Sequence, residues 1–220
     1  MSLFKRSPLV LAILALSSYG QAADNTVVLP TITVIGGESA LPELAGSGSI
    51  LSQKTLESSH PFTVNEALRK VAGVHARDEE GFGLRPNIAI RGLNPTRSTK
   101  ITLLEDGLPL AYAPYGDNAS YYHPMVDRYQ RIEVLKGASS LLFGPQTIGG
   151  VINYITPIPS KEPKGYVQAT AGNHDFANVK LNASGHNALV DYSHIEGDGA
   201  RDNLHHELDD LNVKYSMALG

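Results

Sequence analysis

The glycine-rich stretch over residues 144–150 has the spacing of a phosphate-binding loop. It reads GPQTIGG, so Gly144 and Gly149 stand where such a loop has its first and last glycine. In nucleotide-binding loops the last glycine is followed by lysine and then serine or threonine, which reach the phosphates and the magnesium ion. This chain lacks that pair, so the stretch argues against nucleotide binding and indicates close backbone turns.

A second group of candidate ligands is the run HHELDD over residues 205–210. Its imidazoles and carboxylates belong to the side-chain types that bind zinc. Adjacent histidines of a strand point to opposite faces, and no helix supplies a second ligand at a fixed spacing. The pattern therefore favours a solvated outer loop over residues 196–210 rather than a metal site.

The composition excludes several further kinds of site. The chain of 220 residues has no cysteine, which excludes disulfides and thiolate metal ligands. Its formal net charge of −4 argues against a basic face for nucleic acid. The motifs offer no pairing of a nucleophile with a base, so we expect no enzymatic activity, no catalytic residues, no bound metal and no cofactor.

Two polar loops offer hydrogen-bond donors for an anionic ligand. An arginine fork with phenolic and amide donors suits an anionic ligand such as a polycarboxylate. The candidate substrate-binding residues are Arg97, Tyr115, Asp117, Asn118 and Tyr121. Loop solubility and packing are the alternative for each of them. Loops position a ligand only when a rigid scaffold carries them, so strands must flank these residues.

Short β-branched runs beside these loops predict that scaffold. Strands are expected over residues 87–91, 100–105, 131–135 and 151–156, with turns that contain glycine between them. Residues 63–71 carry apolar side chains at helical spacing, with Thr63 as N-cap and Gly73 as the stop, and predict a helix that packs on the sheet. The expected fold class is α+β, a small mixed sheet with short helices.

The order and wording of these pieces resemble the plug domain of TonB-dependent outer-membrane receptors. The motifs that carry the resemblance are IRG over 90–92, LLEDG over 103–107, RIEVLKG over 131–137, FG over 143–144 and GGVIN over 149–153. Within that family, GLNP over 92–95, APYG over 113–116 and GPQ over 144–146 resemble the ferric citrate receptor group. The resemblance implies a plug domain, here residues 50–159, enclosed by a transmembrane β-barrel.

The first residues predict export. Residues 1–22 combine a basic start at Lys5-Arg6, a short apolar run and small residues at a cleavage site, which is typical of a signal peptide. Residues 38–49 are rich in Gly, Ser, Ala and Pro and predict a flexible linker.

Residues 23–37 contain a β-branched segment that resembles the family's TonB box. Its residues are Thr31, Ile32, Thr33, Val34 and Ile35. The resemblance implies that the energy-transducing TonB complex grips this segment from the periplasm, because an extended segment can add as a strand to a partner's sheet. An ordinary first strand of the plug is the alternative.

Three cations are candidates for a releasable latch between plug and barrel, namely Arg91, Arg131 and Lys136. The family pairs plug cations with barrel glutamates, and buried cations require paired carboxylates. Solvated charges at strand edges are the alternative. The sequence Glu105-Asp106-Gly107 is interpreted as a turn without a binding role.

From residue 164 apolar and polar residues alternate in four segments of about ten residues each, which is typical of membrane strands with one lipid face. Residues 160–220 are therefore predicted to be the first antiparallel strands of a barrel, with His186-Asn187 as a periplasmic turn. Because about eight strands are needed to close even the smallest membrane barrel, we expect an N-terminal piece of a larger receptor.

The function implied is energy-coupled import of a ferric chelate, such as a siderophore or ferric citrate, across the outer membrane of a Gram-negative bacterium. The expected partners are the TonB complex, the chelate and outer-membrane lipid, with iron present only as cargo. Two alternatives stay open: the same machine for zinc, a vitamin or a sugar, and an uncoupled porin that uses the plug as a stopper.

Overall fold

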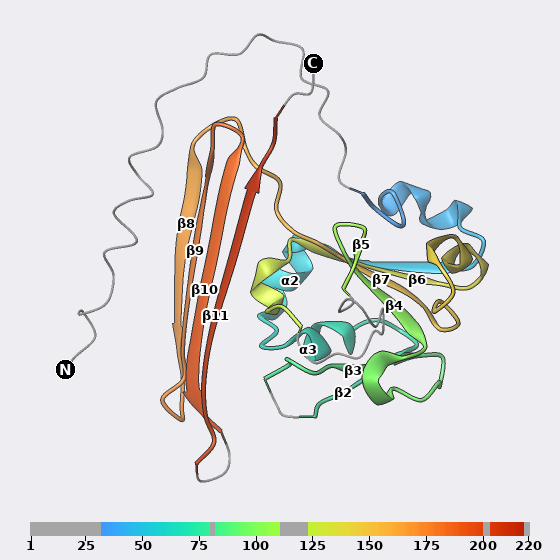
Figure 1. Cartoon of the computed structure of the whole chain (residues 1–220), viewed down its shortest axis with the longest axis horizontal. Coiled ribbons are helices and arrows are strands. Elements are labelled where there is room, and N and C mark those ends of the chain that lie inside the picture. Colours follow the sequence, from blue (N-terminus) through green and yellow to red (C-terminus); the bar gives the residue numbers. More distant parts are fainter. Residues whose placement is uncertain (1–31, 80–81, 111–122, 200–202, 218–220) are drawn as a thin grey trace, which may run out of the picture. The chain divides into compact units, whose positions relative to one another are not determined.

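A five-stranded mixed sheet organises the N-terminal part of the chain. The structure is a computed structural model that describes residues 32–79, 82–110, 123–199 and 203–217. The strands are β1 (Ser47–Leu51), β4 (Ile101–Glu105), β5 (Leu108–Pro109), β6 (Arg131–Lys136) and β7 (Gly150–Ile155), in the order β1-β6-β7-β4-β5 (Figure 1). The pair β4 and β7 is parallel, with Leu103 opposite Ile152, and the other neighbours are antiparallel. The mixed sheet predicted from the β-branched runs is confirmed.

Each face of this sheet buries its own apolar cluster. Side chains that alternate along a strand point to opposite faces, so Ile132 and Val134 enter one cluster and Leu135 enters the other. The larger cluster includes Leu56 and Leu68, from the helices α2 (Gln53–Ser59) and α3 (Val64–Leu68). We call residues 38–159, which contain this sheet, the plug, and treat the segment before them separately.

Helix α3 begins where the sequence predicts and ends earlier. The hydroxyl of Thr63 accepts a hydrogen bond from Glu66 N at 3.3 Å, as an N-cap should. The helix stops at Leu68 because the chain tightens into a turn, in which Lys70 N bonds to Ala67 O. The predicted end near residue 71 is therefore three residues too late.

The predicted flexible linker over residues 38–49 is structured instead. It contains the 3₁₀ helix η2 (Glu38–Glu43) and the start of β1, which pairs with β6 from Ser47 onward. Leu41 and Leu44 pack against the smaller apolar cluster, and this packing offsets the flexibility that the small residues would otherwise confer.

A separate two-stranded sheet pairs β2 (Val74–Arg77) with β3 (Asn87–Ile90), so the predicted strand over 87–91 exists and lies outside the main sheet. The remaining short helices are η3 (Thr96–Ser98), η4 (Val126–Arg128) and η5 (Ala138–Phe143). Among the described residues, no helix is long and apolar enough to cross a bilayer.

Four long antiparallel strands follow the plug, and we call them the wall. They are β8 (Lys164–Ala171), β9 (Ala177–Gly185), β10 (Ala188–Asp198) and β11 (His205–Tyr215), in chain order. The predicted turn at His186-Asn187 joins β9 to β10, with both residues at positive φ. Strands β10 and β11 run further than predicted, which shortens the outer loop to the residues between Asp198 and His205.

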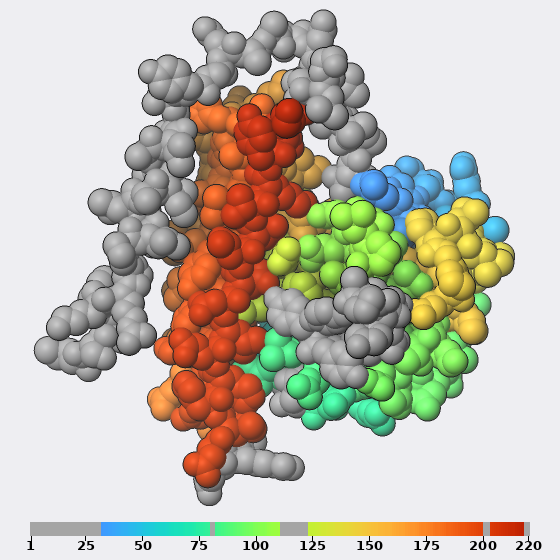
Figure 2. Space-filling view, in the orientation of Figure 1, coloured from blue at the N-terminus to red at the C-terminus, as the bar shows by residue number. Residues whose placement is uncertain are grey.

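The register of the wall separates its two faces. Val167, Leu181 and Tyr192 lie in one row across three strands, and Tyr192 is paired with Leu211. The polar residues that alternate with these along each strand lie on the other face, where Asp191, Ser193 and Asp210 are buried. Strand β11 is open along its length in Figure 2, and its side chains Leu211, Val213 and Tyr215 are exposed.

Candidate functional site

The short helix η4 carries the charges with which the plug meets the wall. Val126 and Tyr129 are buried in the plug core, so the intervening Asp127 and Arg128 are directed outward, toward β9 and β11. This placement follows from one turn of 3₁₀ helix, in which residues three apart share a face.

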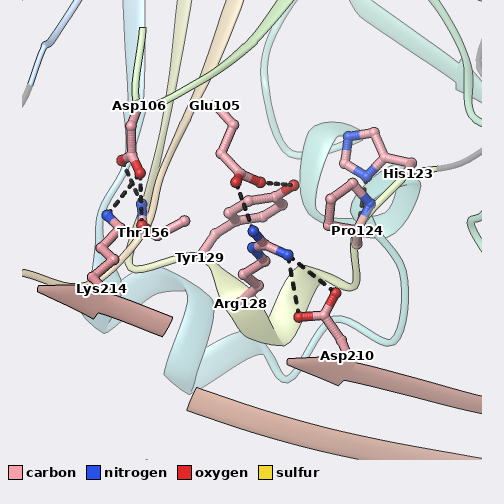
Figure 3. Close-up of polar contacts among 9 residues, drawn as sticks. All are labelled: Glu105, Asp106, His123, Pro124, Arg128, Tyr129, Thr156, Asp210 and Lys214. Atoms are coloured by element: carbon pink, nitrogen blue, oxygen red, sulfur yellow. Dashed lines mark hydrogen bonds and ion pairs between the residues drawn. The ribbon is translucent and has the colours of Figure 1, made fainter. Parts of the chain in front are cut away.

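Arg128 joins the plug to β11 through two carboxylates (Figure 3). Its guanidinium lies 2.8 Å from Glu105 Oε1 in the plug and 3.3 Å from Asp210 Oδ2 in the wall. The hydroxyl of Tyr129 donates to the other oxygen of Glu105 at 3.4 Å. The side chain of Asp210 is only 5% exposed, so a single cation neutralises two carboxylates that are largely removed from water.

Burial and the neighbouring charges together shift the pKa values of Glu105 and Arg128. Burial raises the pKa of Glu105, and the positive charge of Arg128 opposes that rise. Burial alone would lower the pKa of Arg128, but the carboxylates of Glu105 and Asp210 raise it on balance. The guanidinium therefore stays charged, and the ionised form of Glu105 depends on it.

The turn between β4 and β5 makes the second ionic contact with the wall. Asp106 Oδ2 lies 2.7 Å from Lys214 Nζ of β11. Thr156 holds the same carboxylate in place, donating from its backbone N at 3.0 Å and from its hydroxyl at 2.7 Å. Figure 3 shows this contact beside the Arg128 cluster.

Strand β9 is held by Asp127. The amide of Asn178 donates to Asp127 Oδ2 at 3.0 Å, and Lys180 Nζ donates to the carbonyl oxygen of Asp127. A cavity of about 550 Å³ separates α2 from β8 and β9 next to these contacts. The plug thus touches the wall at a few polar points on that side and leaves space between them.

We call Glu105, Asp106, Arg128, Asp210 and Lys214 the latch cluster. The sequence analysis considered Asp210 only within the HHELDD run and did not single out Lys214. It interpreted Glu105-Asp106-Gly107 as a turn without a binding role; the structure gives this turn ionic contacts with Arg128 and Lys214. The sequence LEDG could have indicated these contacts, because two adjacent carboxylates at a hairpin tip require cationic partners when they are buried.

The three cations predicted as a latch make their contacts within the plug among the described residues. Arg131 pairs with Glu133 at 2.9 Å, and Lys136 Nζ donates to Ala72 O at 2.8 Å. Burial, and to a smaller extent the charge of Arg91, lowers the pKa of Lys136. Arg91 is exposed and lies 3.5 Å from Ser47 Oγ. Pairing of these cations with other barrel strands stays a prediction.

Among the predicted substrate-binding residues, only Arg97 is described. It is exposed, has a positive φ of 58°, and donates its backbone N–H to Asn87 Oδ1 at 2.7 Å. Tyr115, Asp117, Asn118 and Tyr121 lie outside the described residues, so ligand binding by the second loop stays a prediction.

The predicted TonB box is described from Ile32 onward. Residues 32–35 form no strand in the described part of the chain. Val34 N and Ile35 N donate to the side chain of Glu133 at 2.7 Å and 3.4 Å, and Ile35 is 5% exposed. The segment therefore lies against the plug sheet without joining it.

The acidic and histidine side chains of the outer loop region lie on paired strands. His194, Glu207 and Asp209 bring ligand-type atoms within 4.8 Å of one another on the outward face. His194 Nδ1 lies 2.9 Å from Asp209 Oδ1, and both carboxylates are exposed. Hydrogen bonds across the two strands, from Tyr192 Oη to Asp209 Oδ1 at 2.6 Å and between His194 Nδ1 and the same oxygen, account for this group.

A known protein family matches the plug, and known proteins match most of the chain. Residues 40–151 match the family model of the TonB-dependent Receptor Plug Domain. The chain is 30% identical over 149 residues to the vitamin B12 transporter BtuB of Vibrio vulnificus, which covers 68% of the chain and 23% of that protein. It is 31% identical over 179 residues to the iron-regulated outer membrane virulence protein of Vibrio cholerae, covering 76% and 26%.

Solved structures share the fold. The unliganded ferric citrate transporter FecA superposes with a TM-score of 0.66 at 26% identity, over 82% of this chain and 30% of that one. The ferric yersiniabactin uptake receptor FyuA of Yersinia pestis, at 19% identity and a TM-score of 0.61, shares the fold over 79% of this chain. The chain spans about a quarter of the length of the curated relatives it matches. It belongs to the family of TonB-dependent receptors of the Gram-negative outer membrane.

Proposed function

We propose that the chain is the plug-bearing part of an energy-coupled receptor that imports a ferric chelate. In this proposal the chelate binds on loops that the plug presents to the outside, and Arg97 is one of its contacts. The TonB complex then pulls residues 31–35 from the periplasm and loosens the plug. The protein changes no covalent bond of its cargo.

The observation that carries the proposal is that the plug and the wall share no apolar cluster. Among the described residues, neither apolar cluster of the plug includes a side chain of β8, β9, β10 or β11. The two parts are joined by the ionic contacts of the latch cluster, by the hydrogen bonds of Asp127 and by two ring contacts, Phe62 with Phe176 and Phe82 with His206.

A contact without a shared apolar core suits a plug that must be released from its wall. Charges that leave a polar contact regain water, whereas apolar side chains that leave a core expose their whole surface to it. A stopper that never moves has no need for this arrangement and could share the core of its wall, so the contact favours coupled transport over an uncoupled pore.

A corrinoid is the second candidate cargo. It is favoured by the likeness to proteins named vitamin B12 transporter, at 30–32% identity. Iron is favoured by the likeness to the iron-regulated protein of Vibrio cholerae and to the ferric citrate transporter. An anionic ferric chelate requires cations such as Arg97, whereas a corrinoid is held mainly by apolar and amide contacts.

The test is uptake by whole cells that carry the full-length receptor. Radiolabelled ferric citrate, other ferric chelates and cyanocobalamin are offered in turn to wild type and to Ile32→Pro. Proline removes a backbone donor and cannot extend as a strand paired with a partner. Glu38→Pro is the matched control, because the first position of a helix accepts proline.

One ferric chelate should accumulate in wild type and in Glu38→Pro. In Ile32→Pro the same chelate should bind at the cell surface and stay there. Uptake of cyanocobalamin instead would assign the corrinoid, and uptake that Ile32→Pro leaves unchanged would refute coupling through this segment.

A further inference from the structure

The carboxylate of Glu133 is the main attachment of residues 32–35 to the plug. It is fully buried on β6, in a sheet where an acid is expensive unless it is paired. Its Oε2 accepts from Val34 N at 2.7 Å and from Ile35 N at 3.4 Å. Its Oε1 lies 2.9 Å from the guanidinium of Arg131. One side chain therefore connects the N-terminal segment with a cation of the plug.

Asn153 supplies the matching contact on the neighbouring strand. The register of β6 and β7 places it directly opposite Glu133, on the same face of the sheet. Its amide nitrogen donates to Ile32 O at 3.1 Å and lies 3.5 Å from Glu133 Oε2. Its amide oxygen accepts from Gly107 N at 2.9 Å. Two opposite polar residues thus form a cradle for a short piece of backbone.

Glycine at position 107 leaves room for this docking. A Cβ at that position would lie 2.3 Å from Ile32 Cγ2. Ile35 fills the remaining space by packing with Leu104, Leu135 and Val151. The cradle is therefore shaped for the segment as well as bonded to it.

We infer that Glu133 is a positioning residue that docks residues 32–35 on the plug and holds them until they are pulled away. The dock uses three hydrogen bonds between side chains and backbone instead of a β-ladder: Val34 N and Ile35 N donate to Glu133, and Asn153 donates to Ile32 O. Few bonds must break to release it, and the segment then offers its own donors and acceptors to a partner strand.

Release changes the situation of Arg131. A buried carboxylate that loses two backbone donors depends more strongly on its remaining cation. Among the described residues, Arg131 at 2.9 Å is the cation that then balances the charge of Glu133. The inference rests on the proposed function only for the identity of the partner that pulls.

The test measures how fast a thiol at position 35 reacts in the folded receptor. Ile35→Cys is introduced into the full-length receptor in outer-membrane vesicles opened to the periplasmic side, together with Glu133→Ala, Glu133→Gln or no second change. A membrane-impermeant maleimide reports exposure of the segment. Glu57→Gln is the matched control, because Glu57 is exposed on α2 and its carboxylate bonds to Gln53 of the same helix.

Labelling at position 35 should speed up by about tenfold or more in Glu133→Ala, since hydrogen bonds to a charged acceptor are among the stronger ones. Glu133→Gln keeps an acceptor oxygen and should give a smaller increase, and Glu57→Gln should give none. A second cysteine in place of Val134, which is fully buried on the same strand, should stay protected in every variant.

Equal labelling of position 35 in wild type, Glu133→Ala and Glu133→Gln would overturn the inference, as would an equal increase in Glu57→Gln. If position 134 also reacts in Glu133→Ala, the plug has unfolded, and the Gln variant decides. The readout needs neither cargo nor transducer. Failure of the coupling proposal would appear only in uptake by Ile32→Pro, so the two failures are distinguishable.

Discussion

Removal of the Arg128 side chain should destabilise the plug in its barrel far more than removal of an exposed cation. In Arg128→Met, the carboxylates of Glu105 and Asp210 lose their shared partner while the volume is largely kept. Their side chains are only 18% and 5% exposed. Breaking a buried pair costs about 3–5 kcal/mol, and we expect about 3 kcal/mol because these groups retain some contact with water.

The assay is hydrogen exchange at the amides of β4 in the full-length receptor, which reports local opening of the plug. A loss of about 3 kcal/mol corresponds to exchange that is about 100-fold faster. Arg69→Ala is the control, since the Arg69 and Asp78 side chains are 47% and 38% exposed and such pairs contribute about 1 kcal/mol or less.

The double variant Arg128→Met with Glu105→Gln completes the test. Neutralising Glu105 removes one of the orphaned charges, so the double variant should be more stable than the sum of the single effects by about 1–3 kcal/mol. If Arg128→Met exchanges no faster than Arg69→Ala, or if the two changes simply add, the latch cluster does not hold the plug as argued.

Three further predictions follow from single side chains. His123 is buried with its Nδ1 2.8 Å from Pro124 O, and burial lowers the pKa of His123 to about 4. Below the ordinary histidine pKa the unfolded chain therefore binds more protons than the folded one, so the free energy of unfolding of the plug should fall by about 2 kcal/mol between pH 7 and pH 5. Thermal unfolding at both pH values should show this fall in wild type and a much smaller one in His123→Phe. Lys214→Met should weaken the plug by about 1–2 kcal/mol in the same exchange assay, because Asp106 keeps its two bonds from Thr156; a loss as large as that of Arg128→Met would contradict this ranking. Thr63→Ala should lower the free energy of unfolding by about 1 kcal/mol because α3 loses its N-cap, whereas Thr63→Ser keeps the hydroxyl and should lower it little. Urea unfolding measures both, and equal losses in the two variants would argue against capping.

Local patterns predicted the elements well. The β-branched runs and their glycine turns located β3, β4, β6 and β7 to within a residue or two at each end, and alternation located β8 to β11, because both signals are written in neighbouring residues. The linker over 38–49 was mispredicted because small residues say nothing of the partner strand that orders them.

The candidate site was less accessible to prediction because its members are distant in sequence. Asp106 meets Lys214 across 108 positions, and Glu133 meets Val34 across 99. Such pairs form only when the strands adopt a particular register, and that register cannot be inferred from the local amino-acid composition. A buried glutamate within RIEVLKG was visible in the sequence, but nothing local showed that its partners are backbone amides.

The rows of the wall also determine how deep the protein sits in its membrane. On the outward face of β10 and β11, the row Tyr192 and Leu211 is the last apolar one, and in the next row His194 Nδ1 lies 2.9 Å from Asp209 Oδ1. Successive rows of one face are two residues apart, about 7 Å along the strand. Moving this boundary by one row, for example with His194→Leu and Asp209→Leu together, would shift the edge of the hydrocarbon layer outward by up to that distance and bring the lipid headgroups to a different level of the plug.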